Sequence, residues 1–185
     1  MSTATAAKLA TYEDLLALPE NQVGEIVNGI LYAHPRPAVL HAQTATILGE
    51  TLGPRFRSRG PNGWLFLDEP ELHLGRHVLV PDLAAWRRDR LPQLPDAPFI
   101  SVAPDWVCEI LSPSTEAVDR AEKLPVYARQ GVAFAWLMSP AVKSLEVFRL
   151  DGATYRLIAT HAGDVAVHAE PFEELALDLR ALWEL

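Results

Sequence analysis

Two apolar runs of the chain each carry a single acidic residue, and these two acids constrain the fold more than any other feature. Asp82 lies in the run 78–86, and Glu109 lies near the end of the run 105–111. A carboxylate in a strand-like hydrophobic run is costly to desolvate unless another group pairs with it. If the two runs form neighbouring strands, both acids converge on one place, where their usual partner is a divalent cation. The sequence therefore predicts a cation site, with Lys123 in the helical stretch that follows.

The composition indicates one globular domain. A chain of 185 residues, 49% of them apolar and 22% charged, can bury a sizeable core and has ordinary globular usage. We expect a flexible tail over residues 1–10 and one domain over residues 11–185. The apolar stretches are short and interrupted, so neither a bilayer-spanning helix nor a membrane partner is expected. The lone Cys108 excludes an internal disulfide, and without a signal-peptide pattern the expected location is the cytoplasm.

The order of the predicted elements favours an α/β (α+β) fold. Asn28-Gly29 and Asp151-Gly152 are typical of tight hairpin turns. Helices are expected over 11–18, over 41–52 with a stop at Gly53-Pro54, from 116 to about 129, and within 175–185. Strands are expected over 25–27, 30–32, 64–67, 71–74, 134–138, 145–150 and 155–158, besides the two acid-bearing runs. This order predicts a single domain in which helices pack on a mixed sheet.

The charge pattern weakens a nucleic-acid role without excluding it. The net charge is −8, and non-specific binding to nucleic acid needs clustered lysine and arginine. Two arginine groups are nevertheless candidates for phosphate contacts: Arg55, Arg57 and Arg59, which would share one face of an extended strand, and Arg87, Arg88 and Arg90, which follow the Asp82 run. Surface solubility explains both groups about equally well.

Three segments form an ordered set of motifs: Val80-Pro81-Asp82-Leu83-Ala84, then Glu109-Ile110-Leu111-Ser112-Pro113-Ser114-Thr115, then Asp119-Arg120 with Lys123 and Tyr127. Tyr12-Glu13-Asp14-Leu15, the hairpin Gly24-Glu25-Ile26-Val27-Asn28-Gly29, Gly131-Val132, Trp136 and Leu182-Trp183 extend the pattern over nearly the whole chain. Together these segments resemble the Uma-two family of endonucleases, within the restriction-endonuclease-like PD-(D/E)XK superfamily. The resemblance implies a mixed central sheet flanked by helices, a magnesium-type site at one sheet edge, and DNA as the substrate.

The resemblance also implies roles for individual residues. Asp82 would be the acid of the PD element, and Glu109 the acid of the (D/E)XK element. The residue two positions after Glu109 should be lysine, but here it is Leu111. The chain resembles a family in which that lysine has moved to the following helix, which makes Lys123 the candidate. Glu25 matches an acid of the family pattern and would complete the metal shell or orient a water molecule.

Hydrolysis of a phosphodiester needs a neutralised phosphate, an activated water and a stabilised leaving oxygen. Asp82 and Glu109 would hold Mg²⁺ (or Mn²⁺), which keeps several waters, with the Ile110 carbonyl as a further ligand. Lys123 would orient or deprotonate the attacking water or stabilise developing charge. We therefore expect a metal-dependent DNA endonuclease with Asp82, Glu109, Lys123 and Glu25 as catalytic residues. Arg87, Arg88 and Arg120 are the candidate nucleic-acid contacts.

Each of these assignments has a structural alternative. Asp82 would cap a turn, Glu109 would pair with Arg120 or Lys123, and Lys123 would be solvated on a helix face. Glu25 would be an ordinary hairpin residue. His41 begins a helix at a position where the family often shows histidine, so it would cap the helix or contact a phosphate, and the alternative is a solvated side chain. For the whole chain, the alternative is a catalytically silent module of the same fold that acts in binding or assembly, which Leu111 and the acidic charge favour. A homodimer is expected, with Trp136, Trp183 and Phe148 as an exposed self-association surface.

Overall fold

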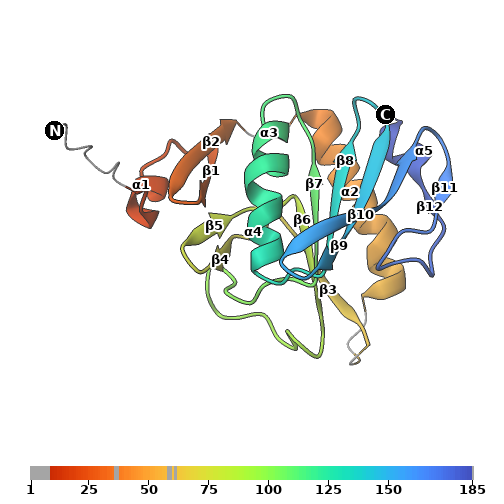
Figure 1. Cartoon of the computed structure of the whole chain (residues 1–185), viewed down its shortest axis with the longest axis horizontal. Helices are drawn as coiled ribbons and strands as arrows, with labels where there is room; N and C mark the ends of the chain where they lie inside the picture. Colours follow the sequence, from red (N-terminus) through yellow and green to blue (C-terminus); the bar gives the residue numbers. More distant parts are fainter. Residues whose placement is uncertain (1–8, 36–37, 58–59, 61, 185) are drawn as a thin grey trace.

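A six-stranded mixed sheet forms the centre of the protein (Figure 1). The computed structural model describes residues 9–35, 38–57, 60 and 62–184. The strand order of the sheet is β10-β9-β8-β7-β6-β3, in which β7 and β8 are parallel and all other neighbours are antiparallel. Its strands are β3 (Trp64–Asp68), β6 (Leu83–Arg87), β7 (Trp106–Ile110), β8 (Phe134–Ser139), β9 (Ser144–Asp151) and β10 (Thr154–Ala162).

A smaller sheet lies beside the central one, at the left of Figure 1. Its strand order is β2-β1-β5-β4, with β1 (Gln22–Val27), β2 (Ile30–Pro35), β4 (Leu72–Leu74) and β5 (His77–Leu79). Asn28 and Gly29 connect β1 to β2 with positive φ angles of 53° and 81°, as a type I′ hairpin turn requires. Helix α1 (Tyr12–Leu16) precedes this sheet, and Thr11 and Asp14 close its first turn as a capping box.

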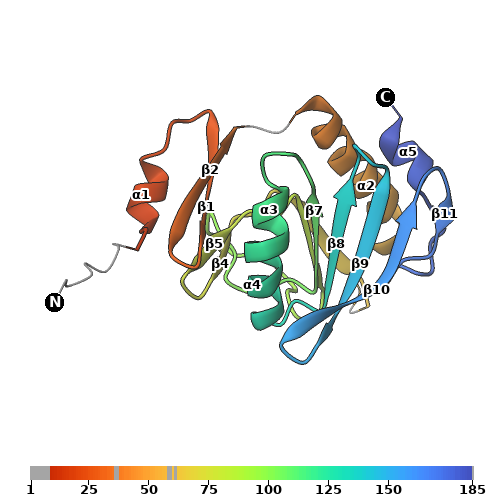
Figure 2. The ribbon, with the colours of Figure 1, turned by 45° about the horizontal axis from the view of Figure 1, so that its top comes forward.

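Helices cover both faces of the central sheet (Figures 1 and 2). Helices α2 (Val39–Phe56) and α5 (Leu179–Trp183) pack on one face. The other face is covered by one continuous helical segment, made of α3 (Glu116–Val118), the π-helical turn η1 (Asp119–Lys123) and α4 (Leu124–Arg129). A short two-stranded sheet, β11 (Ala166–Val167) and β12 (Leu177–Asp178), lies beside α5.

Two apolar cores result from this layering, one on each face of the sheet. In the first core, Leu48 and Leu52 of α2 pack with Trp106, Trp136 and Phe172. The second core is made by α4, the central sheet and the small sheet, and its largest fully buried members are Trp86, Tyr127, Leu72, Leu79 and Leu137. Alternate residues of β6 and β7 therefore face different cores, as the side-chain period of two requires.

The fold class predicted from the sequence is confirmed, because the chain forms a single α+β domain with a mixed central sheet and flanking helices. One predicted strand is wrong. The run 78–86 divides into β5 of the small sheet and β6 of the central sheet, and Asp82 lies between them rather than within a strand. Pro81 has no backbone N–H to donate to a ladder, which explains why the run breaks beside it.

Two further expectations are corrected. Helix α2 continues through Pro54 to Phe56, because Pro54 lies in the last turn, where the helix loses one backbone hydrogen bond at most. Arg55 is consequently helical rather than on an extended strand, and Arg59 lies outside the described residues.

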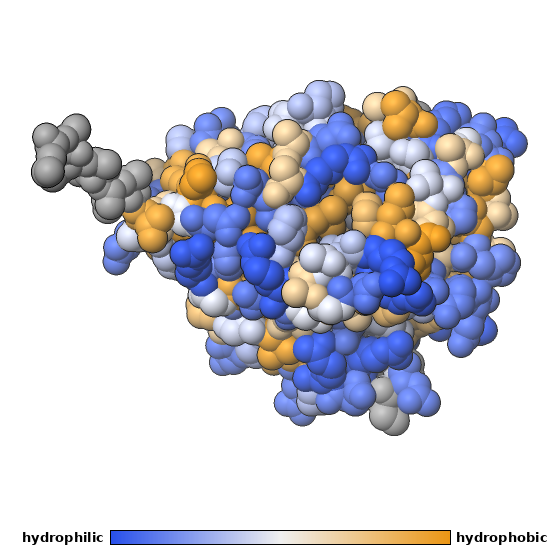
Figure 3. Space-filling model, viewed as in Figure 1, coloured by the Kyte–Doolittle hydropathy of each residue, from blue (hydrophilic) through white to orange (hydrophobic). Residues whose placement is uncertain are grey.

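The expected self-association surface is also wrong. The side chains of Trp136 and Trp183 are buried in the first core, with exposures of 1% and 7%, and Phe148 is half-buried against the second. Burial of these aromatic side chains instead stabilises the fold of the chain. Figure 3 shows hydrophobic residues only in separate patches among hydrophilic ones on the face that it presents. Among the described residues, no helix is long and apolar enough to cross a membrane.

Candidate functional site

A cavity of about 310 Å³ lies where the small sheet meets the central sheet. Its wall includes residues of β1 and β2, the start of α2, the segment before β6 and the loop that follows β7. Polar side chains reach it from these segments, from β7 and η1, and from the residue after β3: Glu25, His34, His41, Glu69, Asp82, Glu109, Ser112, Ser114, Thr115, Asp119 and Lys123. Both acids singled out in the sequence therefore line the same cavity.

Asp82 is held by contacts from two other segments. Its Oδ2 accepts a hydrogen bond of 2.6 Å from the Ile110 backbone N–H, at the end of β7. Its Oδ1 lies 3.3 Å from Nε2 of His41, in the first turn of α2. Strands β6 and β7 pair Leu83 with Cys108, so the antiparallel register would set Asp82 opposite Glu109. The convergence of the two acids thus follows from the pairing of their strands.

His41 lies against Asp82 rather than in solvent, since its side chain is 14% exposed. Burial lowers the pKa of His41, but the hydrogen bond to Asp82 and the negative charge of that carboxylate outweigh the burial, so the pKa is raised. A protonated His41 therefore carries positive charge directly beside Asp82. The sequence signal for this contact was weak, because a single histidine at a helix start is usually solvated.

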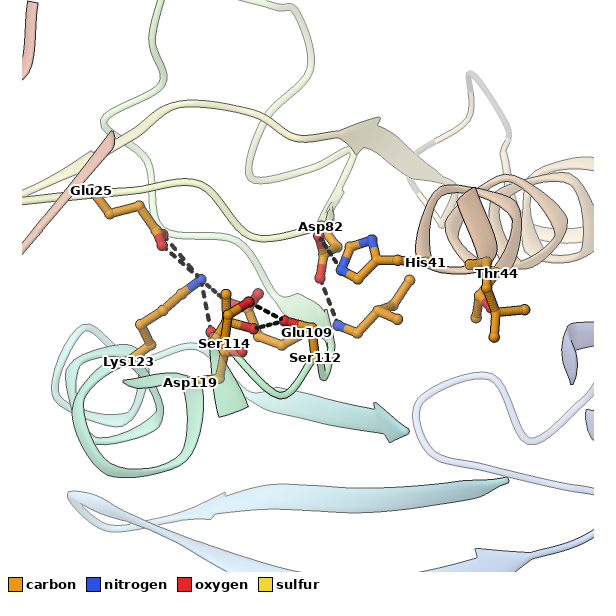
Figure 4. A network of polar contacts seen from close by, with 12 residues as sticks. Glu25, His41, Thr44, Asp82, Glu109, Ser112, Ser114, Asp119 and Lys123 are labelled. Atoms are coloured by element: carbon orange, nitrogen blue, oxygen red, sulfur yellow. Dashed lines mark hydrogen bonds and ion pairs between the residues drawn. The ribbon is translucent and has the colours of Figure 1, made fainter. Parts of the chain in front are cut away.

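Lys123 is surrounded by three carboxylates (Figure 4). Its Nζ lies 2.8 Å from Oε1 of Glu109, 3.0 Å from Oε1 of Glu25 and 3.3 Å from Oδ1 of Asp119. The Lys123 side chain is 3% exposed, so it is not a solvated surface lysine. These contacts join the small sheet, the central sheet and the η1 turn at one point.

Burial and charge act in opposite directions on this cluster. Burial lowers the pKa of Lys123, but the charges of Glu109, Glu25 and Asp119 outweigh it and raise that pKa well above its ordinary value. Burial raises the pKa of Glu109 well above its ordinary value, although the charge of Lys123 lowers it. Lys123 is therefore protonated at neutral pH, and it partly neutralises carboxylates that are expensive to bury.

Tyr127 and Val80 hold two of these carboxylates in position. The Tyr127 hydroxyl donates a hydrogen bond of 2.6 Å to Oε1 of Glu109, and the Val80 backbone N–H donates one of 2.7 Å to Oε1 of Glu25. Burial is the largest cause that raises the pKa of Tyr127, so the hydroxyl keeps its proton and remains a donor. Each carboxylate therefore has a fixed orientation.

Sequence reasoning assigned no role to Asp119 or Tyr127, although both belong to the quoted motif. Asp119, Lys123 and Tyr127 are four residues apart, and this spacing was the available signal, because such residues share a helix face. The structure adds a π-helical turn between Asp119 and Lys123, in which the Leu124 N–H bonds to the Asp119 carbonyl. Turns of this kind are frequent at functional sites.

The donor chemistry of the cavity fits a hard divalent cation. Five acidic side chains line it, and Lys123 is the one lysine or arginine among the described lining residues, so negative charge is in excess. Carboxylate oxygens are the ligands that Mg²⁺ prefers. Among the described residues, however, no three His, Cys, Asp or Glu side chains are grouped closely enough to hold a metal ion by themselves. A cation here would need Asp82, Glu109, a backbone carbonyl and waters.

The predicted nucleic-acid contacts lie apart from this cavity. Arg87 ends β6, at the opposite end of that strand from Asp82, and its guanidinium lies 4.5 Å from the ring centroid of Trp64. Arg88 follows it and donates to the Pro92 carbonyl. Arg120 pairs with Glu116 and Glu146 across distances of 2.8 and 2.6 Å. None of these arginines lines the cavity.

Comparisons with known proteins find similarity over most of the chain. The model of the Uma-two (Uma2) family, described as "Putative restriction endonuclease", matches residues 9–180. Among solved structures, a "putative nuclease belonging to DUF820" from Anabaena variabilis ATCC 29413 is similar with a TM-score of 0.73 and 23% sequence identity, over 94% of this chain and 97% of that chain. At 23% sequence identity, this structural similarity shows that the two chains share a fold. No match is found among curated proteins.

Proposed function

The chain belongs to the Uma-two family, and we propose that it is a metal-dependent endonuclease that hydrolyses phosphodiester bonds in DNA. One observation carries the proposal: Asp82, Glu109 and Lys123 come from three separate segments and line one cavity. Two carboxylates with an adjacent ammonium group suit the hydrolysis of a phosphodiester with a metal ion. A silent module would have no need to keep this cluster of buried charges, which is costly to desolvate.

Asp82 and Glu109 would hold Mg²⁺ or Mn²⁺. When bound, such an ion neutralises phosphate charge and lowers the pKa of a water molecule. His41 and the Ile110 N–H orient Asp82, and Tyr127 orients Glu109, which keeps both carboxylates directed at one place.

The superfamily pattern has a lysine at the position of Leu111, and Lys123 would take the role of that lysine. Leu111 is buried in the second core, whereas the ammonium of Lys123 reaches Glu109 from the helix. Because its pKa is raised, Lys123 keeps its proton and acts by stabilising negative charge and orienting water rather than by deprotonating it. Glu25 would position Lys123, since its carboxylate contacts the ammonium directly.

The homodimer expected from the sequence stays a prediction. Trp136 and Trp183 do not support it, because both are buried in the monomer.

The first prediction concerns the cation. We expect wild-type protein to bind Mn²⁺ in calorimetry, and Asp82→Asn to weaken that binding at least about tenfold, because a neutral amide replaces a ligand. A plasmid-nicking assay should show the same loss of activity. Asp96→Asn is the matched control, since Asp96 is exposed in the loop after β6 and does not line the cavity.

Two results would contradict the proposal. If millimolar Mn²⁺ or Mg²⁺ does not bind to the wild-type protein, the silent module is the better account. If Asp82→Asn nicks plasmid as fast as the wild type does, the activity comes from a contaminating nuclease.

A further inference from the structure

We propose that DNA enters the cavity as an unpaired strand, so that the substrate is single-stranded DNA or the unpaired part of a duplex. This inference rests on the proposed nuclease function and specifies its substrate. Three features carry it: the burial of the reactive groups, the chemistry of the cavity walls and the charge around the cavity.

The reactive groups are enclosed to an extent that a stacked duplex does not suit. The side chains of Glu25, Glu109 and Lys123 are 5%, 3% and 3% exposed. The cavity volume of about 310 Å³ is at the lower end of the range for sites that hold a single small molecule. A phosphodiester bond in a regular duplex is flanked by stacked neighbours and a paired strand, whereas a nucleotide in an unpaired strand can enter alone.

The small sheet supplies one wall of the cavity. Val23 pairs with His34 across β1 and β2, and Glu25 lies two residues further along the same face of β1. All three residues line the cavity, and Pro35 continues this wall beside His34. The imidazole of His34 lies nearly parallel to the ring of Tyr32, at 10° and 6.4 Å between centroids. A ring in this position offers a surface on which an unpaired base can stack.

The lining of the cavity combines apolar and charged groups, as a nucleotide does. Val23, Pro35, Val80 and Pro113 give apolar surface, which suits a sugar and a base. Asp82, Glu109 and Lys123 give the groups that would bind the cation and face the phosphate.

The charge around the cavity also disfavours a duplex. Binding of a duplex depends on many phosphate contacts from lysine and arginine. Lys123 is the one such residue among the described lining residues, and three carboxylates already surround it. Arg87 and Arg88 lie at the far end of β6. A site whose cationic side chains are Lys123 and a protonated His41, both already beside carboxylates, gains more from stacking and from a bound metal ion than from phosphate contacts along two strands.

The test uses labelled DNAs of one sequence: a single strand, a blunt duplex, and the same duplex with an internal unpaired bulge. In Mn²⁺, we expect the single strand and the bulge to be cut at least about tenfold faster than the paired duplex, because unpairing a base costs a few kcal/mol. Anisotropy in Ca²⁺ measures binding without relying on cleavage. There, His34→Ala should weaken binding of the single strand about fivefold or more, and His34→Phe should retain it.

His161→Ala is the matched control, because His161 lies on β10 and does not line the cavity. All three histidine variants should bind Mn²⁺ as the wild type does, which shows that the cation site is intact. Equal cutting of the paired duplex, with Mn²⁺ bound, overturns this inference and leaves the proposed function standing. Unchanged binding in His34→Ala overturns the assignment of the stacking wall. Absence of both Mn²⁺ binding and cleavage overturns the proposed function itself.

Discussion

At the scale of single residues, the site depends on one buried ammonium group among acids. Lys123 is 98 residues from Glu25 in sequence, yet its Nζ contacts both oxygens of that carboxylate, at 3.0 and 3.2 Å. The side chains of Lys123 and Glu25 are 3% and 5% exposed, so solvent screens their charges little. Such a group affects stability and chemistry together, because each carboxylate is tolerable in the interior only while the ammonium is present.

We predict that Lys123→Met destabilises the protein by about 3–5 kcal/mol, since it leaves three buried carboxylates without their counter-ion. Urea denaturation at pH 7 measures this loss. Lys143→Met is the control, because the pair of Lys143 with Asp164 is 45% and 44% exposed and contributes less than about 1 kcal/mol. Equal losses in the two variants would show that the Lys123 cluster contributes no more than a surface ion pair.

At the scale of elements, backbone geometry sets where the functional side chains lie. The Asn28-Gly29 turn fixes the register of β1 against β2, and this register places Val23, Glu25 and His34 on one face. The break beside Pro81 places Asp82 just before β6, where its backbone carbonyl accepts the Glu69 N–H and its carboxylate accepts the Ile110 N–H. The η1 turn sets the offset between Asp119 and Lys123 on the helix.

Two glycine substitutions test how far the backbone decides stability. Gly29→Ala should cost about 1–2 kcal/mol, because φ at Gly29 is 81° and an L side chain is strained there. Gly49→Ala should instead stabilise the protein by about 0.5–1 kcal/mol, because Gly49 lies inside α2. A Cβ at Gly49 would meet Asp68 and Leu83 at an ordinary 3.6 Å. Chemical denaturation measures the change in unfolding free energy of each variant. If both variants are destabilised, or both are stabilised, this account is contradicted.

At the scale of the whole molecule, polar contacts attach the small sheet to the helical layer. Asn28 Nδ2 donates to Glu122 at 2.9 Å, and Arg129 donates to Asn28 Oδ1 at 3.3 Å. The Asn28 backbone N–H donates to Nδ1 of His77, at 3.1 Å. Because the small sheet supplies one wall of the cavity, these contacts connect the stability of the domain to the shape of the site.

The His77 contact predicts how stability depends on pH. Burial, and then the charges of Arg76 and Arg129, lower the pKa of His77, so the folded protein keeps this imidazole neutral. The unfolded chain binds the proton more readily, so this contribution is complete above the ordinary histidine pKa of about 6.5 and is lost as pH falls through the lowered pKa of the folded state. His77→Asn should therefore reduce the loss of unfolding free energy between pH 7.5 and pH 5.5. An unchanged pH dependence would contradict this assignment.

Much of the fold and part of the site could be predicted from the sequence. The hairpin at Asn28-Gly29 and the capping box at Thr11 depend on neighbouring residues alone, so their local chemistry identified them. The isolated acids Asp82 and Glu109 were recognisable for a similar reason, because the cost of desolvating a carboxylate follows from the apolar run around it.

Only the tertiary structure decided the rest. The run around Asp82 divides between two sheets, Trp136 is buried rather than exposed, and Lys123 meets Glu25, Glu109 and Asp119 at one point. Each of these outcomes depends on contacts between segments far apart in the chain. Periodicity within a segment shows on which face of a helix or strand a residue lies. The packing of whole layers determines which other residues that face contacts.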